Sequence, residues 1–247
     1  MVQSIIKANA VINYIAHHDN RVKLADISKD LGINKSTLHG ILQTLVYCGL
    51  LTQDPETTYY SLGLKLFELG KIYEKDFSLV EVAKPFMLKL NDQFKESVHL
   101  AIESNFEVLY IECIQSTHSV RTDSSIGGTD PLYATSAGKI ILAYADGSYV
   151  DTYLENCSFH PLTPNTITNR DDLTRQFDMV RTQGYAIDNE EVEIGLRCIS
   201  VPILGPNESL LGIISVSGPT ARMDQKIDDV IAQTVILCKE LSHSLGC

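Results

Sequence analysis

A run of polar side chains near the amino end of the sequence has the residue types that contact nucleic acid. Lysine and short hydroxyl side chains bind phosphate oxygens, whereas His39 and Gln43 carry the donors and acceptors that base edges require. The apolar residues Leu38, Leu42 and Leu45 recur at helical spacing, so the polar residues share the opposite face. The polar set comprises Asn34, Lys35, Ser36, Thr37, His39, Gln43 and Thr44.

Three helices and a hairpin are expected to position this face. The first helix is predicted over residues 5–15 with Ser4 as its N-cap, the second stops at Gly32, and Asn34 caps the third. Two short apolar runs around a turn at Pro55 then predict a hairpin. Two helices joined by a tight turn and followed by a hairpin indicate a winged helix-turn-helix.

Two residues outside the third helix extend the candidate DNA-binding set. Lys23 precedes the second helix, and Thr57 lies in the hairpin turn. Gly40 interrupts the polar face, because glycine inside a helix costs about 1 kcal/mol relative to alanine and offers no side chain to a groove. A small residue there permits close approach to the DNA backbone, a hypothesis that the sequence alone does not test.

A second group of residues could bind a small anion. Ser136 opens a predicted helix, and free N–H groups at a helix start attract a carboxylate. Ser215 and Ser217 alternate along a predicted strand, so both hydroxyls point to one face. Asp188 and Cys198 flank an acidic segment that we expect to be a solvated loop over the site. An ordinary capped helix and serines that bond within the core are the alternative interpretations.

The elements that carry this second group are of mixed type. A helix over residues 63–76 leads out of the hairpin, and the later helices and β-branched runs predict an α+β domain with an antiparallel sheet. The expected domains are 1–62, a linker helix over 63–78, and 79–247. The later elements are helices over 79–95, 136–145, 171–182 and 224–245, and strands over 98–102, 108–114, 198–204 and 210–216.

Composition sets the protein class. The 247 residues are 44% hydrophobic and 21% charged, which is ordinary globular usage. Absence of a long apolar run or a signal-peptide core leads us to expect a cytoplasmic protein with no membrane contact. The six cysteines form no C-x-x-C pair and have no close Cys/His spacing, so we expect reduced thiols, no metal site and no cofactor.

The net charge of −11 at first argues against DNA, because phosphate binding depends on Lys and Arg. The charge is unevenly spread, however. Residues 1–75 hold 8 basic and 7 acidic residues, whereas the rest of the chain holds 12 and 24. The acidity therefore belongs to the second part of the chain, and the first part is close to neutral.

The whole chain resembles the IclR family of bacterial transcriptional regulators. Ordered motifs from end to end carry the resemblance: Leu24-Ala25-Asp26-Ile27, Leu31-Gly32-Ile33-Asn34-Lys35-Ser36-Thr37, Leu42-Gln43-Thr44-Leu45, Tyr60-Ser61-Leu62-Gly63, Ala134-Thr135-Ser136-Ala137-Gly138-Lys139, Gly195-Leu196-Arg197-Cys198 and Ser215-Val216-Ser217-Gly218-Pro219.

The resemblance implies an N-terminal winged helix-turn-helix, a linker helix and a C-terminal effector-binding domain of GAF-like topology. It also implies homodimers, or dimers of dimers, on double-stranded, palindromic operator DNA. The implied effector is a small organic acid: a keto, sugar or aromatic acid. The implied effector-binding residues are Ser136, Ala137, Gly138, Asp188, Leu196, Cys198, Ser215 and Ser217.

Two positions depart from the family pattern. Family members commonly carry Arg where this sequence has Gly40, so a usual DNA contact is missing here. Ser136 replaces a glycine of some members, which affects the size of the pocket. Arg121 and His118 could add positive charge near that pocket, although solvated surface positions are the favoured interpretation for both.

The main hypothesis is a DNA-binding regulator controlled by a small acid, with two alternatives. An enzyme acting on a small acid would use Cys198 as nucleophile or the carboxylates of Glu190, Glu191 and Glu193. The sequence has no Gly-rich cofactor loop, no G-x-S-x-G elbow and no H-E-x-x-H pair, which argues against catalysis. A ligand sensor whose first domain binds protein rather than DNA is the second alternative.

Overall fold

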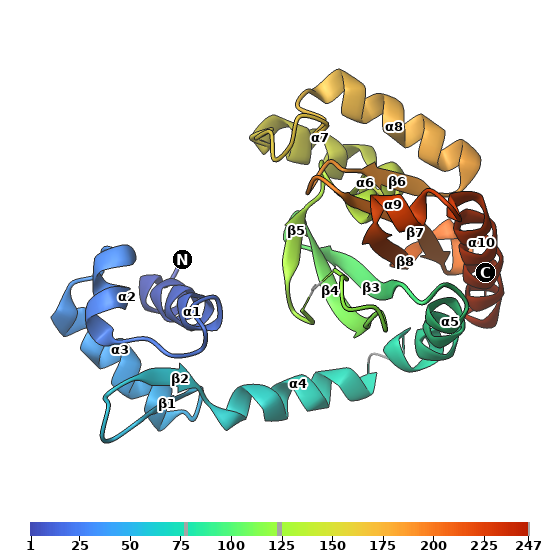
Figure 1. Ribbon diagram of the computed structural model, residues 1–247. Helices are drawn as coiled ribbons and strands as arrows, with labels where there is room; N and C mark the ends of the chain where they lie inside the picture. Colours follow the sequence, from blue (N-terminus) through green and yellow to red (C-terminus); the bar gives the residue numbers. More distant parts are fainter. Residues whose placement is uncertain (77–78, 123–124, 247) are drawn as a thin grey trace. The chain divides into compact units, whose positions relative to one another are not determined.

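The chain folds as two units, residues 1–78 and 79–247, in a computed structural model that describes residues 1–76, 79–122 and 125–246 (Figure 1). The expected end of the linker helix at residue 78 lies outside the described residues.

The first unit is built from four helices and a two-stranded hairpin, within its described residues. Its core is a single cluster of aliphatic side chains in which Ile15, Ile27, Leu38 and Leu42 are fully buried. Burial of one apolar stripe from each of the first three helices turns their polar stripes outward. The elements are α1 (Gln3–Ala16), α2 (Leu24–Asp30), α3 (Lys35–Tyr47), β1 (Leu51–Gln53), β2 (Tyr60–Leu62) and α4 (Leu64–Asp76).

Local chemistry sets most of the helix ends in this unit. The Asn34 side-chain oxygen accepts a hydrogen bond from the Thr37 amide at 2.9 Å, which confirms the predicted cap. Gly32 has a φ of +63°, so the turn between α2 and α3 uses backbone geometry that glycine adopts without strain. The expected Ser4 cap was wrong: α1 begins at Gln3, and its N-cap residue Val2 makes no side-chain cap.

The hairpin is tied to the chain ahead of α2. Strands β1 and β2 pair antiparallel, with Leu51 opposite Leu62. Val22 forms an isolated antiparallel bridge to Tyr60. The Leu62 amide also donates to the Asn20 side-chain oxygen at 2.6 Å. These bonds fix the wing against the helix-turn-helix.

The second unit is built on a six-stranded antiparallel sheet with the order β5-β4-β3-β8-β7-β6. Helix α6 packs on one face with α8 behind it, and α5 and α10 pack together on the other face (Figure 1). The elements are α5 (Leu79–Phe94), β3 (Ser97–Ser104), β4 (Glu107–Ile114), β5 (Thr129–Pro131), α6 (Ser136–Tyr144), α7 (Gly147–Asn156), α8 (Arg170–Gln183), β6 (Ala186–Asn189), β7 (Leu196–Leu204), the 3-10 turn η1 (Pro206–Glu208), β8 (Leu210–Pro219), α9 (Thr220–Met223) and α10 (Ile227–Ser244).

The predicted helices and strands are confirmed with small changes of bounds, and several short elements of the second unit were missed. Strands β5 and β6 and helix α7 had no counterpart in the sequence analysis, because three to ten residues carry too little periodicity to stand out. The closing helix begins at Ile227 rather than at residue 224, after the separate short helix α9. None of the helices in the described part of the chain is long and apolar enough to cross a membrane.

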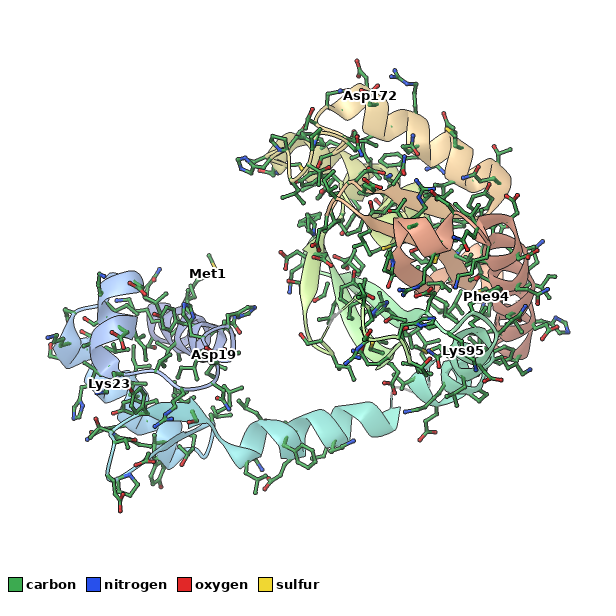
Figure 2. All side chains as sticks on the ribbon, viewed as in Figure 1. Met1, Asp19, Lys23, Phe94, Lys95 and Asp172 are labelled. Atoms are coloured by element: carbon green, nitrogen blue, oxygen red, sulfur yellow. The ribbon has the colours of Figure 1, made fainter. Side chains whose placement is uncertain are left out.

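A buried carboxylate joins three elements of this unit. Glu96 is fully buried just after α5, and Arg222 of α9 holds it with two hydrogen bonds of 2.8 and 2.6 Å. Lys226, at the start of α10, donates to Glu96 at 2.8 Å and to the Phe94 carbonyl at 2.8 Å. Figure 2 labels Phe94 and Lys95, where α5 ends and this cluster begins. The cluster therefore fixes α9 and α10 to the end of α5.

Loss of one partner of Glu96 should destabilise the fold strongly. We expect Arg222→Met to lower the free energy of unfolding by about 3 kcal/mol, because it leaves a buried carboxylate with a single cation. Arg170→Met is the matched control, since its ion pair with Asp151 is exposed and should contribute less than about 1 kcal/mol. Denaturant unfolding measures both, and equal effects would contradict the assigned role.

Candidate functional site

Helix α3 presents the predicted polar face to solvent. Leu38, Leu42 and Leu45 of this helix are buried, whereas its polar residues Lys35, Ser36, Thr37, His39 and Gln43 are exposed. The structure therefore brings the candidate DNA-reading residues together on one surface. Asn34, Thr44 and Lys23 are exposed as well.

The start of α3 is organised by its own side chains. Asn34 accepts from the Thr37 amide, and the Ser36 hydroxyl donates to the same Asn34 oxygen at 3.1 Å. The first-turn N–H groups and the adjacent Lys35 side chain form a positive end that favours an anion such as phosphate. The helix N-terminus and the Lys35 charge therefore both favour binding of an anion here.

The wing places two cations over one aromatic ring. The charged groups of Arg21 and Lys23 lie 4.7 and 4.9 Å from the ring centre of Tyr59. Figure 2 shows Lys23 beside the start of α2. The Thr57 amide donates to the Asp54 carboxylate at 2.8 Å, and the Thr57 hydroxyl is enclosed. Of the candidate contacts, Thr57 is thus the one whose side-chain oxygen points away from solvent.

Gly40 leaves a gap in the polar face of α3. A Cβ atom added at Gly40 would meet nothing within 4 Å, so packing within the unit does not require glycine there. The Thr44 hydroxyl donates to the Gly40 carbonyl at 2.8 Å, one turn back along the helix. The backbone at Gly40 is therefore open to an approaching partner.

The second unit contains a small cavity where α6 begins against the sheet. Its volume is about 40 Å³, and most of the residues implied by the resemblance line it. Gly138 does not: a Cβ there would lie 2.1 Å from the Leu132 carbonyl oxygen, so its role is close packing of α6. The implied residues that line the cavity are Ser136, Ala137, Asp188, Leu196, Cys198, Ser215 and Ser217.

Among the described residues, six more line the cavity that the sequence analysis did not assign to it. They come from strands and loops far apart in the sequence, so spacing could not bring them together. His99 had one usable signal, because it is a polar residue within an apolar strand. The six are His99, Tyr110, Thr122, Asp130, Thr135 and Val192.

The start of α6 is the part of the cavity suited to a carboxylate. Thr135 caps the helix by accepting from the Gly138 amide at 3.0 Å and donates to the Pro131 carbonyl at 3.1 Å. The Ser136 hydroxyl lies 2.8 Å from that of Ser200. The first N–H groups of α6 therefore face a wall already equipped with hydroxyls.

Burial sets the charges around the cavity. It raises the pKa of Asp188 to about 7, with the nearby Glu191 charge adding to the rise, while backbone N–H donors and Lys139 oppose it. Burial also raises the pKa of Asp130 and holds that of the Cys198 thiol well above its usual range. Among the described residues lining the cavity, none is Lys or Arg. Cys198 is thus a neutral thiol rather than an activated nucleophile.

The acidic segment after β6 is the expected loop, but it is solvated only in part: Glu193 is exposed, whereas Glu191 is buried. Glu191 is 5% exposed, and its carboxylate lies 2.5 Å from the ammonium of Lys139, which is 1% exposed. Lys139 also donates to the Ile187 carbonyl at 2.9 Å. Burial of a carboxylate requires such a partner, and spacing could not reveal one 52 residues away. The pair holds α6 against the turn that covers the cavity.

A second hollow of about 570 Å³ adjoins the cavity. The two share Thr122, Asp130, Val192 and Leu196 in their walls. Arg121 lines the outer hollow, where its guanidinium also donates to the His118 carbonyl at 3.4 Å. The hollow therefore forms a vestibule with a cation at its wall.

Comparison with known proteins assigns the family. The IclR helix-turn-helix domain matches residues 4–55, and the C-terminal domain of the bacterial transcriptional regulator IclR matches residues 72–242. The chain belongs to the IclR family of bacterial transcriptional regulators. It is 33% identical over 246 residues to the HTH-type transcriptional regulator KdgR of Escherichia coli K12, covering 99% of this chain and 93% of that protein.

Solved structures support the same assignment. The Thermotoga maritima IclR structure superposes with a TM-score of 0.76 at 29% identity and covers 100% of both chains. An IclR homolog from Microbacterium hydrocarbonoxydans complexed with 4-hydroxybenzoate has the same fold, with a TM-score of 0.80 at 22% identity over 92% of each chain. IclR-family relatives are transcriptional regulators, so this chain is a DNA-binding regulator and not an enzyme.

The open backbone at Gly40 leads to a test of its role. We expect Gly40→Ala to raise the free energy of unfolding by about 0.5–1 kcal/mol, because the added Cβ has room and alanine favours the helix. If close approach to DNA requires glycine, the same variant should bind duplex DNA more weakly. Thermal melting and fluorescence anisotropy measure the two effects, and unchanged DNA affinity would reject the close-approach hypothesis.

The raised pKa of Asp188 predicts a pH-dependent stability. In the unfolded chain this carboxyl titrates near 3.8, and in the folded chain at about 7. Between these values the folded protein binds the extra proton, so its contribution to stability is lost as pH rises through about 7. Asp188→Asn should flatten the fall in unfolding free energy between about pH 4 and pH 7. Parallel curves for the variant and the wild type would contradict the prediction.

Proposed function

We propose that this chain binds a palindromic operator through α3 and that a small hydroxylated acid in the second unit controls its affinity for that operator. The observation that carries the DNA-binding part is the exposed polar face of α3, whose start is capped by Asn34. The observation that carries the effector part is the polar cavity at the start of α6.

The residues of α3 divide into two roles. Lys35, Ser36 and Thr37 lie at the positive end of the helix and would contact phosphate oxygens. His39 and Gln43 lie further along the exposed face and have the reach to meet base edges. Asn34, Thr44, Lys23 and the wing around Thr57 would add backbone contacts.

The lining of the cavity favours a hydroxylated acid. Its aliphatic members are Ala137, Val192 and Leu196, and the others are polar or aromatic with a hydroxyl group. The start of α6 would hold the carboxylate, and Asp130 and Asp188 would accept hydrogen bonds from ligand hydroxyls. A neighbour of the same fold is complexed with 4-hydroxybenzoate, which supports a small acid as the effector. Keto and sugar acids fit the polar lining better than a purely aromatic acid.

The cavity must widen to take such a ligand. A volume of about 40 Å³ holds about one water molecule, whereas ligand pockets measure about 300–1,000 Å³. The vestibule gives a route in past Arg121, whose charge would attract the acid. If the walls of the cavity move apart when a ligand enters, ligand binding changes the conformation of the second unit. Control of DNA binding then requires that the effector bind the two conformations with unequal affinity.

A homodimer joined through the first units would present two α3 helices to DNA. Exposed apolar side chains occupy α1 and α4, where no described residue covers them. A second copy of the same surface would bury these side chains. The two α3 helices would then meet two half-sites about one helical turn apart on the DNA. We place this complex in the cytoplasm, where the chromosome lies. The exposed residues are Val2, Ile5, Ile6, Leu64, Phe67, Leu69 and Ile72.

DNA binding should be steeply salt-dependent and divisible by residue. On duplexes selected from a random pool, we expect Lys35→Ala to weaken binding to all sequences and to lower the salt slope by about one. Gln43→Ala should instead change the ranking of the duplexes. Fluorescence anisotropy at several salt concentrations measures both, with Lys239→Ala in the second unit as control. Absent or salt-independent binding by the wild type would reject the proposed function.

Disruption of the apolar surface should dissociate the dimer. Phe67 is 62% exposed, so a charge there should not harm the fold but should oppose burial against a second copy. We expect Phe67→Glu to weaken dimerisation by at least about tenfold, measured by sedimentation velocity. Lys65→Glu on the same helix is the control. A Phe67→Glu chain that associates as the wild type does would exclude this interface.

A further inference from the structure

One ring nitrogen in the cavity wall, Nε2 of His99, has no hydrogen-bond partner among the described residues. His99 lies on β3, where it pairs in register with Ser215 of β8 and with Cys113 of β4. Its side chain is 2% exposed and lines the cavity. Nε2 makes no hydrogen bond to any residue that the structure describes. Buried nitrogens are normally paired, so this one is available to whatever occupies the cavity.

The other side of the ring is held in place. Nδ1 lies 3.4 Å from the Ser217 hydroxyl, which lies 2.8 Å from the Thr122 hydroxyl. The ring also packs at a tilt against Tyr110, with 5.5 Å between ring centres. These contacts fix the direction in which Nε2 points.

The imidazole is neutral at physiological pH, because burial lowers its pKa to about 4. A neutral ring carries one proton, and its place depends on the bond at the other nitrogen. We assign the Thr122 hydroxyl as donor to Ser217 and the Ser217 hydroxyl as donor to Nδ1. Nε2 then carries the proton. The titratable groups that share the cavity with this ring are Tyr110, Asp130, Asp188 and Cys198.

A neutral donor suits a neutral oxygen. The ligand carboxylate is best placed at the start of α6, where helix N–H groups supply positive charge. The donor at His99 therefore remains for a second oxygen on the same molecule. Acids that lack this oxygen would leave the buried N–H unpaired, which disfavours their binding.

We propose that His99 is a specificity-determining residue, whose Nε2 donates to a keto or hydroxyl oxygen of an acid bound by its carboxylate at α6. This inference rests on the proposed effector pocket. It predicts that two acids differing by one oxygen atom bind with different affinities. Removal of the ring nitrogen should remove that difference in affinity.

Calorimetric titration of the full-length chain with matched acids tests the inference. The pairs are 2-oxobutyrate and butyrate, 2-oxoglutarate and glutarate, gluconate and 2-deoxygluconate, and 4-hydroxybenzoate and benzoate. We expect the wild type to bind the oxygenated member of at least one pair about tenfold or more tightly than its mate. His99→Phe keeps the ring volume and should reduce that preference to below about threefold, whereas His99→Gln retains an N–H donor and should keep most of it.

The outcomes distinguish the role of His99 from the existence of the effector pocket. Unchanged preference in His99→Phe overturns the role of His99 and leaves the effector pocket standing. Binding of no acid by the wild type overturns both. His160→Gln, a substitution of an exposed histidine that lines neither the cavity nor the vestibule, should bind as the wild type does.

Nitrogen-15 spectra of the histidine rings in the wild-type protein provide a readout that does not depend on folding of a variant. The expected signal for His99 at pH 7 is a neutral ring with its proton on Nε2. A charged ring, or a proton on Nδ1, would overturn the inference. The Nε2–H resonance should also shift on addition of the preferred acid.

Discussion

A lysine ammonium and a glutamate carboxylate meet inside the second unit, and the proposed effector pocket depends on that contact. Lys139 belongs to the first turn of α6, and Glu191 lies in the turn between β6 and β7. Their ion pair connects the two walls between which the cavity forms. The Glu191 amide also donates to Asp188 at 2.7 Å, so the same turn positions a carboxyl of the cavity. Thr166 secures the turn from outside by donating to the Glu191 carbonyl at 2.6 Å.

The two units differ in net charge, and this difference suits them to different roles. The first unit is nearly neutral, so its affinity for DNA would depend on a few placed groups, such as Lys35 and the start of α3, rather than on a general positive field. Acidic residues predominate after residue 75, which would repel the duplex and confine DNA to the reading face. A near-neutral head also makes pairing of two heads on one site the natural source of affinity. The whole-chain charge of −11 therefore describes the second unit and not the DNA-binding surface.

Local patterns in the sequence predicted local structure well. The apolar spacing of α3, the Asn34 cap and the turn at Gly32 all appear in the structure because neighbours along the chain determine them. The environment of Glu191 could not be predicted this way, since its partner comes from a distant helix. His99 was missed for the same reason: its position in the cavity depends on strand order. Local patterns suggested five of the seven predicted cavity residues as anion contacts, and the resemblance added Ala137 and Leu196.

A double-mutant cycle on the buried ion pair tests the central claim most directly. The free energies of unfolding of the wild type, Lys139→Met, Glu191→Leu and the double variant would be measured in denaturant. If the pair holds the two walls together, each single variant should lose about 3 kcal/mol or more by leaving a buried charge alone. The double variant should recover much of that loss, giving a coupling energy of at least about 2 kcal/mol. Additive losses would contradict the account, because they would mean that the two residues stabilise the fold independently.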